Sequence, residues 1–174
     1  PGNIMLKRSG HAKIIDIGSA FDLIDPPKKQ TCTPVYAALE VLEGKENTPR
    51  SDLASLGYVL IELLAGKSVF AGIEDFNGLI EAKRTLKDQL AEIMPDEVAC
   101  NELLMSFLAG LIAPNPEDRF PDAESANLVD VGAAAFHRQL VKSDLSTEYE
   151  NDIRIWIDDL LELEAAESGG LWLE

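Results

Sequence analysis

The chain has 174 residues, of which 46% are apolar and 26% are charged, the balance of a soluble globular protein with one domain-sized core. Its formal net charge of −16 disfavours binding to nucleic acid or to an anionic membrane surface, since both attract basic proteins. The longest apolar stretch, residues 53–66, contains Glu62 and is too short and too polar to span a bilayer.

The number and spacing of the cysteines indicate the redox state of the cellular compartment. Only Cys32 and Cys100 occur, without the spacing typical of a disulfide framework or a zinc site. This usage favours a reducing compartment, and we expect the protein to be cytoplasmic. The chain begins at Pro1 with neither an initiator Met nor a leader, so we expect it to be a piece of a longer protein.

The first sixteen residues predict a β-hairpin. Two short apolar runs, 3–6 and 12–16, flank a polar stretch containing Gly10, and glycine readily takes the positive φ of a tight turn. Over residues 17–33 there is little periodicity, with the sequence Asp-Pro-Pro-Lys-Lys-Gln at 25–30. We therefore predict a loop of about seventeen residues, a length typical of functional or disordered loops.

The rest of the chain predicts helices. A nearly all-apolar stretch, residues 53–64, follows Ser51, a suitable N-cap residue, and is followed by Gly66, a suitable C-cap. We expect this helix to be central and buried because it is apolar nearly all round. Two further helices are predicted over 101–112 and 123–136, where proline signals stand beside apolar runs.

The last part of the chain differs in composition. Residues 143–174 hold ten acidic residues and one basic residue, Arg154. A capping-box pattern at 147–150 starts a segment in which six apolar residues share one helix face: Tyr149, Ile153, Trp156, Ile157, Leu160 and Leu161. We therefore predict an acidic amphipathic helix over 147–165, whose apolar face packs on its own lobe or on a partner.

Five short motifs occur along the chain: Pro1-Gly-Asn3, Lys13-Ile-Ile-Asp16-Ile-Gly18, Thr33-Pro-Val-Tyr36-Ala-Ala-Leu-Glu40, Ser51-Asp52 and Pro116-Glu-Asp-Arg119. In this order they resemble the C-terminal lobe of eukaryotic-type Ser/Thr protein kinases, from the end of the catalytic loop through D-F-G and A-P-E to the late structural arginine. The resemblance covers about residues 1–136. It implies a mainly α fold with a small β-hairpin, divided into a kinase-like C-terminal lobe over 1–138 and an acidic extension over 139–174.

The resemblance also implies a reaction, the transfer of the ATP γ-phosphate to a Ser or Thr of a protein substrate. Asn3 and Asp16 would supply oxygen ligands to Mg²⁺, which neutralises charge on the phosphoryl oxygens. They bracket the predicted hairpin, so their side chains can converge at one end of it. Gly18 would belong to the same ATP site and let the backbone turn after the metal ligand. Thr33 would hydrogen-bond the catalytic-loop lysine and aspartate beside the substrate hydroxyl.

Three further residues are implied to be architectural. Glu40 and Arg119 would form a buried ion pair between the activation segment and the late helices, and Asp52 would hold the backbone of the catalytic loop. The alternative for the first two is a pair of solvated charges. For Asp52, the alternative is an acid stabilised only by the N-terminus of its helix.

The sequence departs from the family pattern at Ile17 of D-F-G, at Leu39 of A-P-E and at Ala54, where a tryptophan is common. None of these changes removes a charged group. The chain contains no glycine-rich phosphate loop and no strand lysine, and the catalytic aspartate would lie about five positions before Asn3. We therefore expect the isolated chain to be inactive and to need the N-terminal lobe of its parent.

Two other functions stay open. A pseudokinase would keep the fold as a binding or scaffolding module, and the retention of both Asn3 and Asp16 argues against it. An acidic helical interaction protein would have no nucleotide chemistry. The arrangement of Asn3 and Asp16 at the ends of the hairpin discriminates this last alternative from a kinase.

Overall fold

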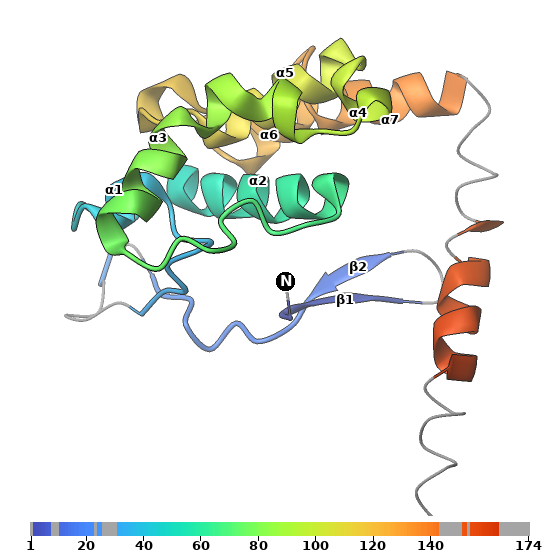
Figure 1. Cartoon of the computed structure of the whole chain (residues 1–174), viewed down its shortest axis with the longest axis horizontal. Helices are drawn as coiled ribbons and strands as arrows, with labels where there is room; N and C mark the ends of the chain where they lie inside the picture. Colours follow the sequence, from blue (N-terminus) through green and yellow to red (C-terminus); the bar gives the residue numbers. More distant parts are fainter. Residues whose placement is uncertain are drawn as a thin grey trace, which may run out of the picture. The chain divides into compact units, whose positions relative to one another are not determined.

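The computed structural model describes residues 2–7, 11–22, 24–25, 31–142, 151–152 and 154–163. The described residues form one β-hairpin followed by a series of helices, the mainly α fold that the sequence predicts (Figure 1). The chain separates into two compact units. The first comprises residues 1–20 and 138–174, and the second comprises residues 21–137.

The hairpin consists of β1 (Ile4–Leu6) and β2 (Ala12–Ile14), which pair antiparallel with Ile4 opposite Ile14. The backbone N–H of Lys7 donates to the carbonyl of His11 at 2.9 Å and closes the ladder at the turn. This confirms the predicted hairpin, with strands slightly shorter than the apolar runs. The proposed turn glycine, Gly10, lies outside the described residues.

The helices follow in chain order. They are α1 (Leu39–Leu42), α2 (Pro49–Ala65), α3 (Phe76–Ile93), α4 (Asp96–Ala99), α5 (Glu102–Ile112), the short 3₁₀ helix η1 (Pro116–Asp118), α6 (Ala123–Leu128) and α7 (Ala133–Lys142).

Helix α2 begins earlier than its apolar stretch suggests. Its N-cap is Thr48, and Pro49 occupies the first helical position, where the fixed φ of proline suits a helix start. The prediction that Ser51 caps the helix is wrong, because its Oγ lies inside the first turn and accepts a hydrogen bond from the Thr48 N–H at 3.1 Å. The predicted end is confirmed, since Gly66 adopts the left-handed conformation with φ 65°.

The later helices are partly as predicted. Helix α5 is confirmed, with Asn101 as its side-chain N-cap. The single helix predicted over 123–136 is wrong, because the chain leaves the helical conformation at Val129 and resumes it in α7. Gly132 lies in this break, and a Cβ there would be 2.5 Å from the carbonyl oxygen of Ala126. The turn between α6 and α7 therefore packs tightly on the end of α6.

Helix α3 has no counterpart among the predicted helices. Its buried positions are Leu79, Lys83, Leu86 and Leu90, which lie on one face at helical spacing. A lysine occupies the second of these positions. The apolar pattern is interrupted there, which explains why periodicity alone does not reveal the helix.

The core is built around α2, which packs chiefly against α5 (Figure 1). At Gly57 the two helices are so close that a Cβ would lie 2.5 Å from Cγ2 of Ile112 and 2.9 Å from Cβ of Leu111. The largest apolar side chains buried around this contact are Tyr58, Ile61, Leu86, Leu108, Leu111 and Ile112. The prediction of a central, buried helix is therefore confirmed.

The acidic C-terminal segment is helical over residues 151–152 and 154–163, within the predicted range. The proposed capping box at 147–150, with Tyr149, and also Ile153 lie outside the described residues. Trp156 is 54% exposed, and Leu160 and Leu161 are also exposed. Ile157 on the same stripe is half-buried, so the packing of this stripe on its own lobe or on a partner stays a prediction.

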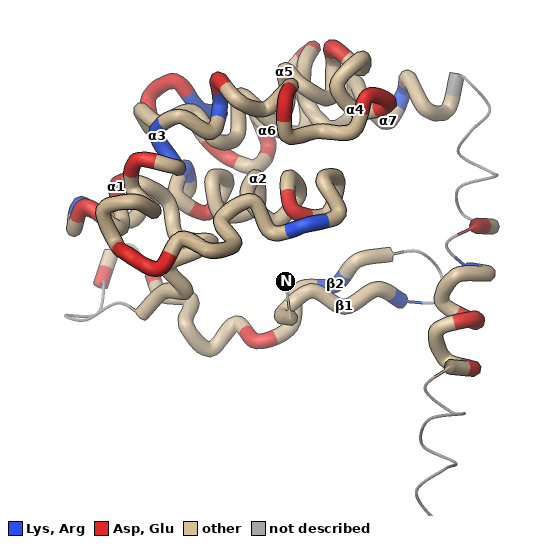
Figure 2. Tube along the Cα trace, viewed as in Figure 1, with Lys and Arg blue, Asp and Glu red and all other residues tan. Residues whose placement is uncertain are grey.

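Acidic residues outnumber basic residues, with 31 Asp and Glu against 15 Lys and Arg. Figure 2 shows Lys and Arg at scattered positions among more numerous Asp and Glu along the described chain. Among the described residues, no helix combines the length and the apolar character needed to cross a membrane.

Candidate functional site

The two candidate metal ligands lie at the open end of the β-hairpin. The carbonyl of Asn3 accepts a hydrogen bond from the Ile15 N–H at 2.8 Å, which extends the ladder by one pair beyond β1 and β2. Asp16 is the next residue after Ile15. Both Asn3 and Asp16 are exposed. The backbone pairing therefore brings these two residues to the same end of the hairpin.

Asp16 has an unusual backbone conformation. Its φ is 60°, the one positive φ among the described non-glycine residues. Asp tolerates this left-handed region better than most residues because its side chain can bond locally, and here Oδ1 accepts from the Gly18 N–H at 3.1 Å. Residues held in such conformations cluster at functional sites. The sharp turn therefore lies at Asp16 itself, rather than at Gly18.

Gly18 matters through its closeness to that carboxylate. A Cβ at Gly18 would lie 3.2 Å from Oδ1 of Asp16, tighter than ordinary van der Waals contact. Glycine therefore lets the N–H approach the carboxylate without a clash. Ile17, the apolar residue between them, is 75% exposed.

The donor chemistry of this end suits Mg²⁺. An amide and a carboxylate are oxygen ligands, which hard divalent cations prefer. The described residues contain no cluster of three or more His, Cys, Asp or Glu side chains arranged to hold a metal ion. Mg²⁺ is usually bound by one or two carboxylates together with waters and substrate phosphates, so a magnesium site does not need such a cluster.

Thr33 opens a compact turn in the second unit. Its carbonyl accepts hydrogen bonds from the N–H groups of Tyr36 and Ala37, both at 3.0 Å. The hydroxyl of Tyr36 lies 3.2 Å from both carboxylate oxygens of Glu62 on α2 and donates to them. Burial, reinforced by Glu62, raises the pKa of Tyr36, so this hydroxyl stays protonated. The turn that carries Thr33 is thereby anchored to the central helix.

Glu40 and Arg119 meet in the interior of the second unit. Arg119 donates from both terminal nitrogens to the two carboxylate oxygens of Glu40, at 2.7 and 2.8 Å. The Arg119 side chain is 0% exposed and that of Glu40 is 5% exposed. This two-pronged geometry joins α1 to the segment after η1, across a sequence separation of 79 residues.

The remaining hydrogen-bonding groups of this pair are also used. Arg119 donates from Nε to the carbonyl of Ala113 at 2.7 Å and from NH1 to the carbonyl of Arg50 at 3.1 Å. Ser51 donates to Oε1 of Glu40 at 2.7 Å. Burial alone raises the pKa of Glu40, but the bonds from Arg119 and Ser51 outweigh it and hold this pKa below its ordinary value. The carboxylate is therefore charged at neutral pH.

Asp52 lies in the first turn of α2. The residue is exposed, yet the surrounding protein desolvates its carboxylate enough to raise the pKa. This position in the first turn is compatible with both interpretations of Asp52, an architectural acid and an acid at a helix N-terminus.

One buried charged residue was not found from the sequence. Lys83 on α3 is 0% exposed, and its Nζ donates to the carbonyl of Val35, inside the turn opened by Thr33, at 2.7 Å. The signal in the sequence is a lysine at an apolar position of a helical pattern, between Leu79 and Leu86.

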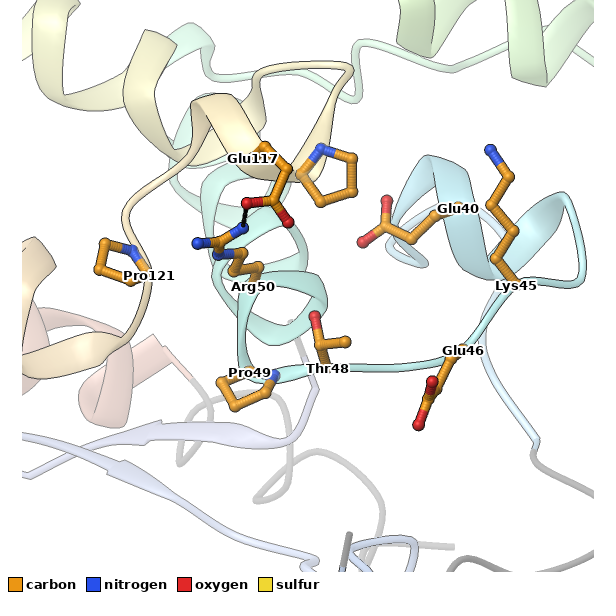
Figure 3. Close-up of a pocket in the computed structure, with 9 residues that line it drawn as sticks. Glu40, Lys45, Glu46, Thr48, Pro49, Arg50, Glu117 and Pro121 are labelled. Atoms are coloured by element: carbon orange, nitrogen blue, oxygen red, sulfur yellow. Dashed lines mark ion pairs between the residues drawn. The ribbon is translucent and has the colours of Figure 1, made fainter.

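A hollow of about 460 Å³ is lined in part by Glu40, one member of the buried ion pair (Figure 3). It is lined by Glu40, Lys45, Glu46, Thr48, Pro49, Arg50, Pro116, Glu117 and Pro121. Its two basic side chains have carboxylate partners, since Arg50 pairs with Glu117 at 2.5 Å and Lys45 with Glu43 at 2.6 Å. We therefore do not assign this hollow to phosphate binding.

Comparison with known proteins finds similarity to protein kinases. The profile of the Protein kinase domain matches residues 1–128. The chain is 29% identical over 127 residues to the mitogen-activated protein kinase kinase MST7 of Pyricularia oryzae, covering 68% of this chain and 31% of that protein.

Two further similar proteins are also protein kinases. Atypical protein kinase C of Drosophila melanogaster is 27% identical over 147 residues, covering 79% of this chain and 24% of the relative. The serine/threonine-protein kinase PknA of Corynebacterium glutamicum is 30% identical over 132 residues, covering 74% and 27%. The chain spans less than a third of the length of these three relatives. Since the domain profile matches well over half of the chain and the fold is that of a kinase-like C-terminal lobe, the chain belongs to the protein kinase family.

Proposed function

We propose that the chain is part of a Ser/Thr protein kinase, which transfers the γ-phosphate of ATP to Ser or Thr residues of a protein substrate. The observation that carries this proposal is the open end of the hairpin, where the backbone pairing brings Asn3 to the same end as Asp16, whose φ is 60°. The match to the Protein kinase domain supports it, since residues 1–128 contain every residue to which we assign a role.

Each site residue has a part in this proposal. Asn3 and Asp16 hold Mg²⁺ together with the ATP phosphates, and Gly18 keeps the Asp16 carboxylate oriented through its N–H. The bound ion would neutralise the negative charge that develops on the transferring phosphoryl group. Thr33 lies beside the substrate hydroxyl and orients the catalytic groups that act on it.

The architectural residues support the segment that carries Thr33 and the catalytic loop. The ion pair between Glu40 and Arg119 fixes the end of the segment that carries Thr33 to the later helices. Asp52 holds the backbone of the catalytic loop. In this division of the chain, residues 1–138 form the kinase lobe and residues 139–174 form an acidic extension.

We further propose that the 174-residue chain alone does not transfer phosphate. It lacks the glycine-rich loop and the strand lysine that cover and pair the ATP phosphates in kinases. Met5, Leu6 and Ile14 of the hairpin and Ile17 after it are substantially exposed. The N-terminal lobe of the parent protein would cover apolar side chains of this region. The two cysteines are free and exposed, in keeping with a cytoplasmic protein.

The test compares Asp16→Asn with a matched control, Asp22→Asn, in the full-length protein. Asp22 is a good control because its Oδ1 also accepts from the N–H two residues later, that of Ile24, at 3.0 Å. We expect Asp16→Asn to lower kcat by about 100-fold or more, since a charged metal ligand is lost, and Asp22→Asn to leave kcat unchanged.

The assay measures Mg²⁺-dependent incorporation of radiolabelled phosphate into a generic basic protein, with urea denaturation to verify that stability is retained. The isolated chain should give no incorporation. A full-length protein that is inactive with intact upstream motifs, or an Asp16→Asn variant as fast as wild type, would instead favour a pseudokinase.

A further inference from the structure

Lys83 is a fully buried cation outside the residues used so far. It lies on the inner face of α3 between Leu79 and Leu86, at a position where an apolar residue would complete the stripe. Among the described residues no carboxylate forms an ion pair with it. Burying an ammonium group without a counter-charge is unfavourable, so its presence needs an explanation other than packing.

The surroundings of the ammonium are unusual. Nζ lies 3.6 Å from the ring centroid of Tyr58 and 4.3 Å from that of Phe70. These two rings pack edge to face, with centroids 5.6 Å apart. Ring faces attract a cation, which offsets part of the cost of desolvation. The rings therefore form a cage that orients the lysine toward a single acceptor.

That acceptor is the carbonyl of Val35, at 2.7 Å from Nζ. Val35 lies within the turn whose ends are joined by the hydrogen bonds from Tyr36 and Ala37 to Thr33. The turn is consequently held from two directions. Glu62 on α2 binds the side chain of Tyr36, and Lys83 on α3 binds the backbone of Val35.

We propose that Lys83 is a positioning residue for the protein substrate: by holding the Val35 carbonyl, it sets the conformation of the turn that presents Thr33. This inference rests on the proposed kinase function and adds a determinant of substrate binding to it. Lys83 acts through the turn and does not itself touch ATP or the reacting atoms. Its loss should therefore weaken substrate binding more than it slows the chemical step.

The experiment compares Lys83→Met with Lys87→Met in the full-length protein. Methionine is of similar length and suits a buried apolar stripe, so the variant removes the hydrogen bond without leaving a large cavity. Lys87 lies on the same helix but is exposed, and serves as the matched control. The readouts are KM and kcat for a peptide substrate, KM for ATP, urea denaturation and amide hydrogen exchange in the 33–37 turn.

For Lys83→Met we expect an increase of about tenfold in the KM for peptide, because the buried hydrogen bond to the Val35 carbonyl is lost. The KM for ATP and kcat should change little, and resistance to urea should stay equal or rise. Exchange of the Tyr36 and Ala37 amides should accelerate by about tenfold. Lys87→Met should match wild type in every readout.

Two results would overturn the proposal. Unchanged peptide KM and unchanged exchange would make Lys83 a space-filling residue, and a parallel loss of kcat, both KM values and stability would make it a general structural residue. If the wild-type protein transfers no phosphate at all, the kinase proposal fails separately. In that case, amide hydrogen exchange in the 33–37 turn of Lys83→Met is the remaining test of whether Lys83 fixes the Val35 carbonyl.

Discussion

Two fully buried cations of the second unit are stabilised in opposite ways. Arg119 has a carboxylate partner, Glu40, and every one of its nitrogens finds an acceptor. Lys83 has a backbone carbonyl and two aromatic ring faces instead. The first arrangement holds the pKa of Glu40 below its ordinary value, whereas desolvation lowers the pKa of Lys83 to about 7.

The difference shows what a counter-charge provides. A paired charge stays ionised over the whole physiological range, which suits a permanent connection between α1 and the chain after η1. A caged but unpaired lysine changes its protonation near neutrality. It can still donate a hydrogen bond when neutral, so the contact with Val35 persists while its strength changes.

The largest expected effect comes from breaking the paired site. Arg119→Met should lower the free energy of unfolding by about 3–5 kcal/mol, because the Glu40 carboxylate is left buried without its partner. A double variant with Glu40→Leu should recover part of this loss. Urea denaturation of the four proteins in this cycle measures the coupling, and a coupling energy of zero would mean that the two charges act independently.

The unpaired site should reveal itself through pH. The pKa of Lys83 is about 7 when folded and 10.5 ordinarily, so between these values the unfolded chain binds a proton that the folded chain does not. Stability should therefore rise with pH above neutrality, by about 2 kcal/mol between pH 7 and pH 9 relative to Lys83→Met.

Two titratable groups next to Lys83 enter this prediction. Cys32 favours the charged form of the lysine, while burial raises the pKa of Tyr58 to about 12 and keeps that ring neutral up to pH 9. Urea denaturation at several pH values, with Lys83→Met subtracted, isolates the contribution of the lysine. Parallel curves for the two proteins would show that Lys83 keeps its ordinary pKa.

A smaller effect should sharpen the description of the paired site. Ser51→Ala removes the donor to Glu40 and the acceptor of the Thr48 N–H, and should cost about 1–2 kcal/mol. Ser55→Ala is the matched control because the Ser55 hydroxyl bonds only within its own helix, to the Ser51 carbonyl. Equal losses in thermal denaturation would show that the bond to Glu40 contributes nothing.

The smallest effect is expected at the surface. Arg50 and Glu117 join α2 to η1 close to the buried pair, since Arg119 also donates to the Arg50 carbonyl, but the Glu117 side chain is 77% exposed. Their coupling energy in a double-mutant cycle should stay below about 1 kcal/mol and should fall further at high salt. A coupling as large as that of Glu40 and Arg119 would show that burial is not what distinguishes the two pairs.

The hairpin and several helix ends can be predicted from the sequence because they depend on neighbouring residues. The hairpin follows from two short apolar runs around a turn, and the structure retains the predicted C-cap at Gly66 and, within one residue, the predicted bounds of the helix over 101–112. The sequence does not distinguish Thr48 from Ser51 as the N-cap, because a residue at the N-cap and one three positions later can both bond to the helix start. The break at Val129 was missed because an apolar pattern continues across it.

Contacts between residues far apart in the sequence could not be predicted from local patterns. Glu40 and Arg119 are separated by 79 residues, and no periodicity relates them, so the resemblance to kinases supplied the expectation of a pair. Lys83 belongs to none of the family motifs quoted above, and its acceptor lies 48 residues away. The side-chain distance between Asn3 and Asp16 likewise depends on the geometry of the hairpin end, which sequence spacing does not determine.

The left-handed backbone of Asp16 decides which substitutions can probe its chemistry. Asn enters this region at least as readily as Asp, so Asp16→Asn changes the charge while the backbone keeps its shape. Alanine, and still more a β-branched residue such as valine, would resist φ 60° and move the chain around Gly18 as well. An inactive Asp16→Ala protein would therefore report on conformation and charge together, whereas Asn and Ala variants compared side by side separate the two.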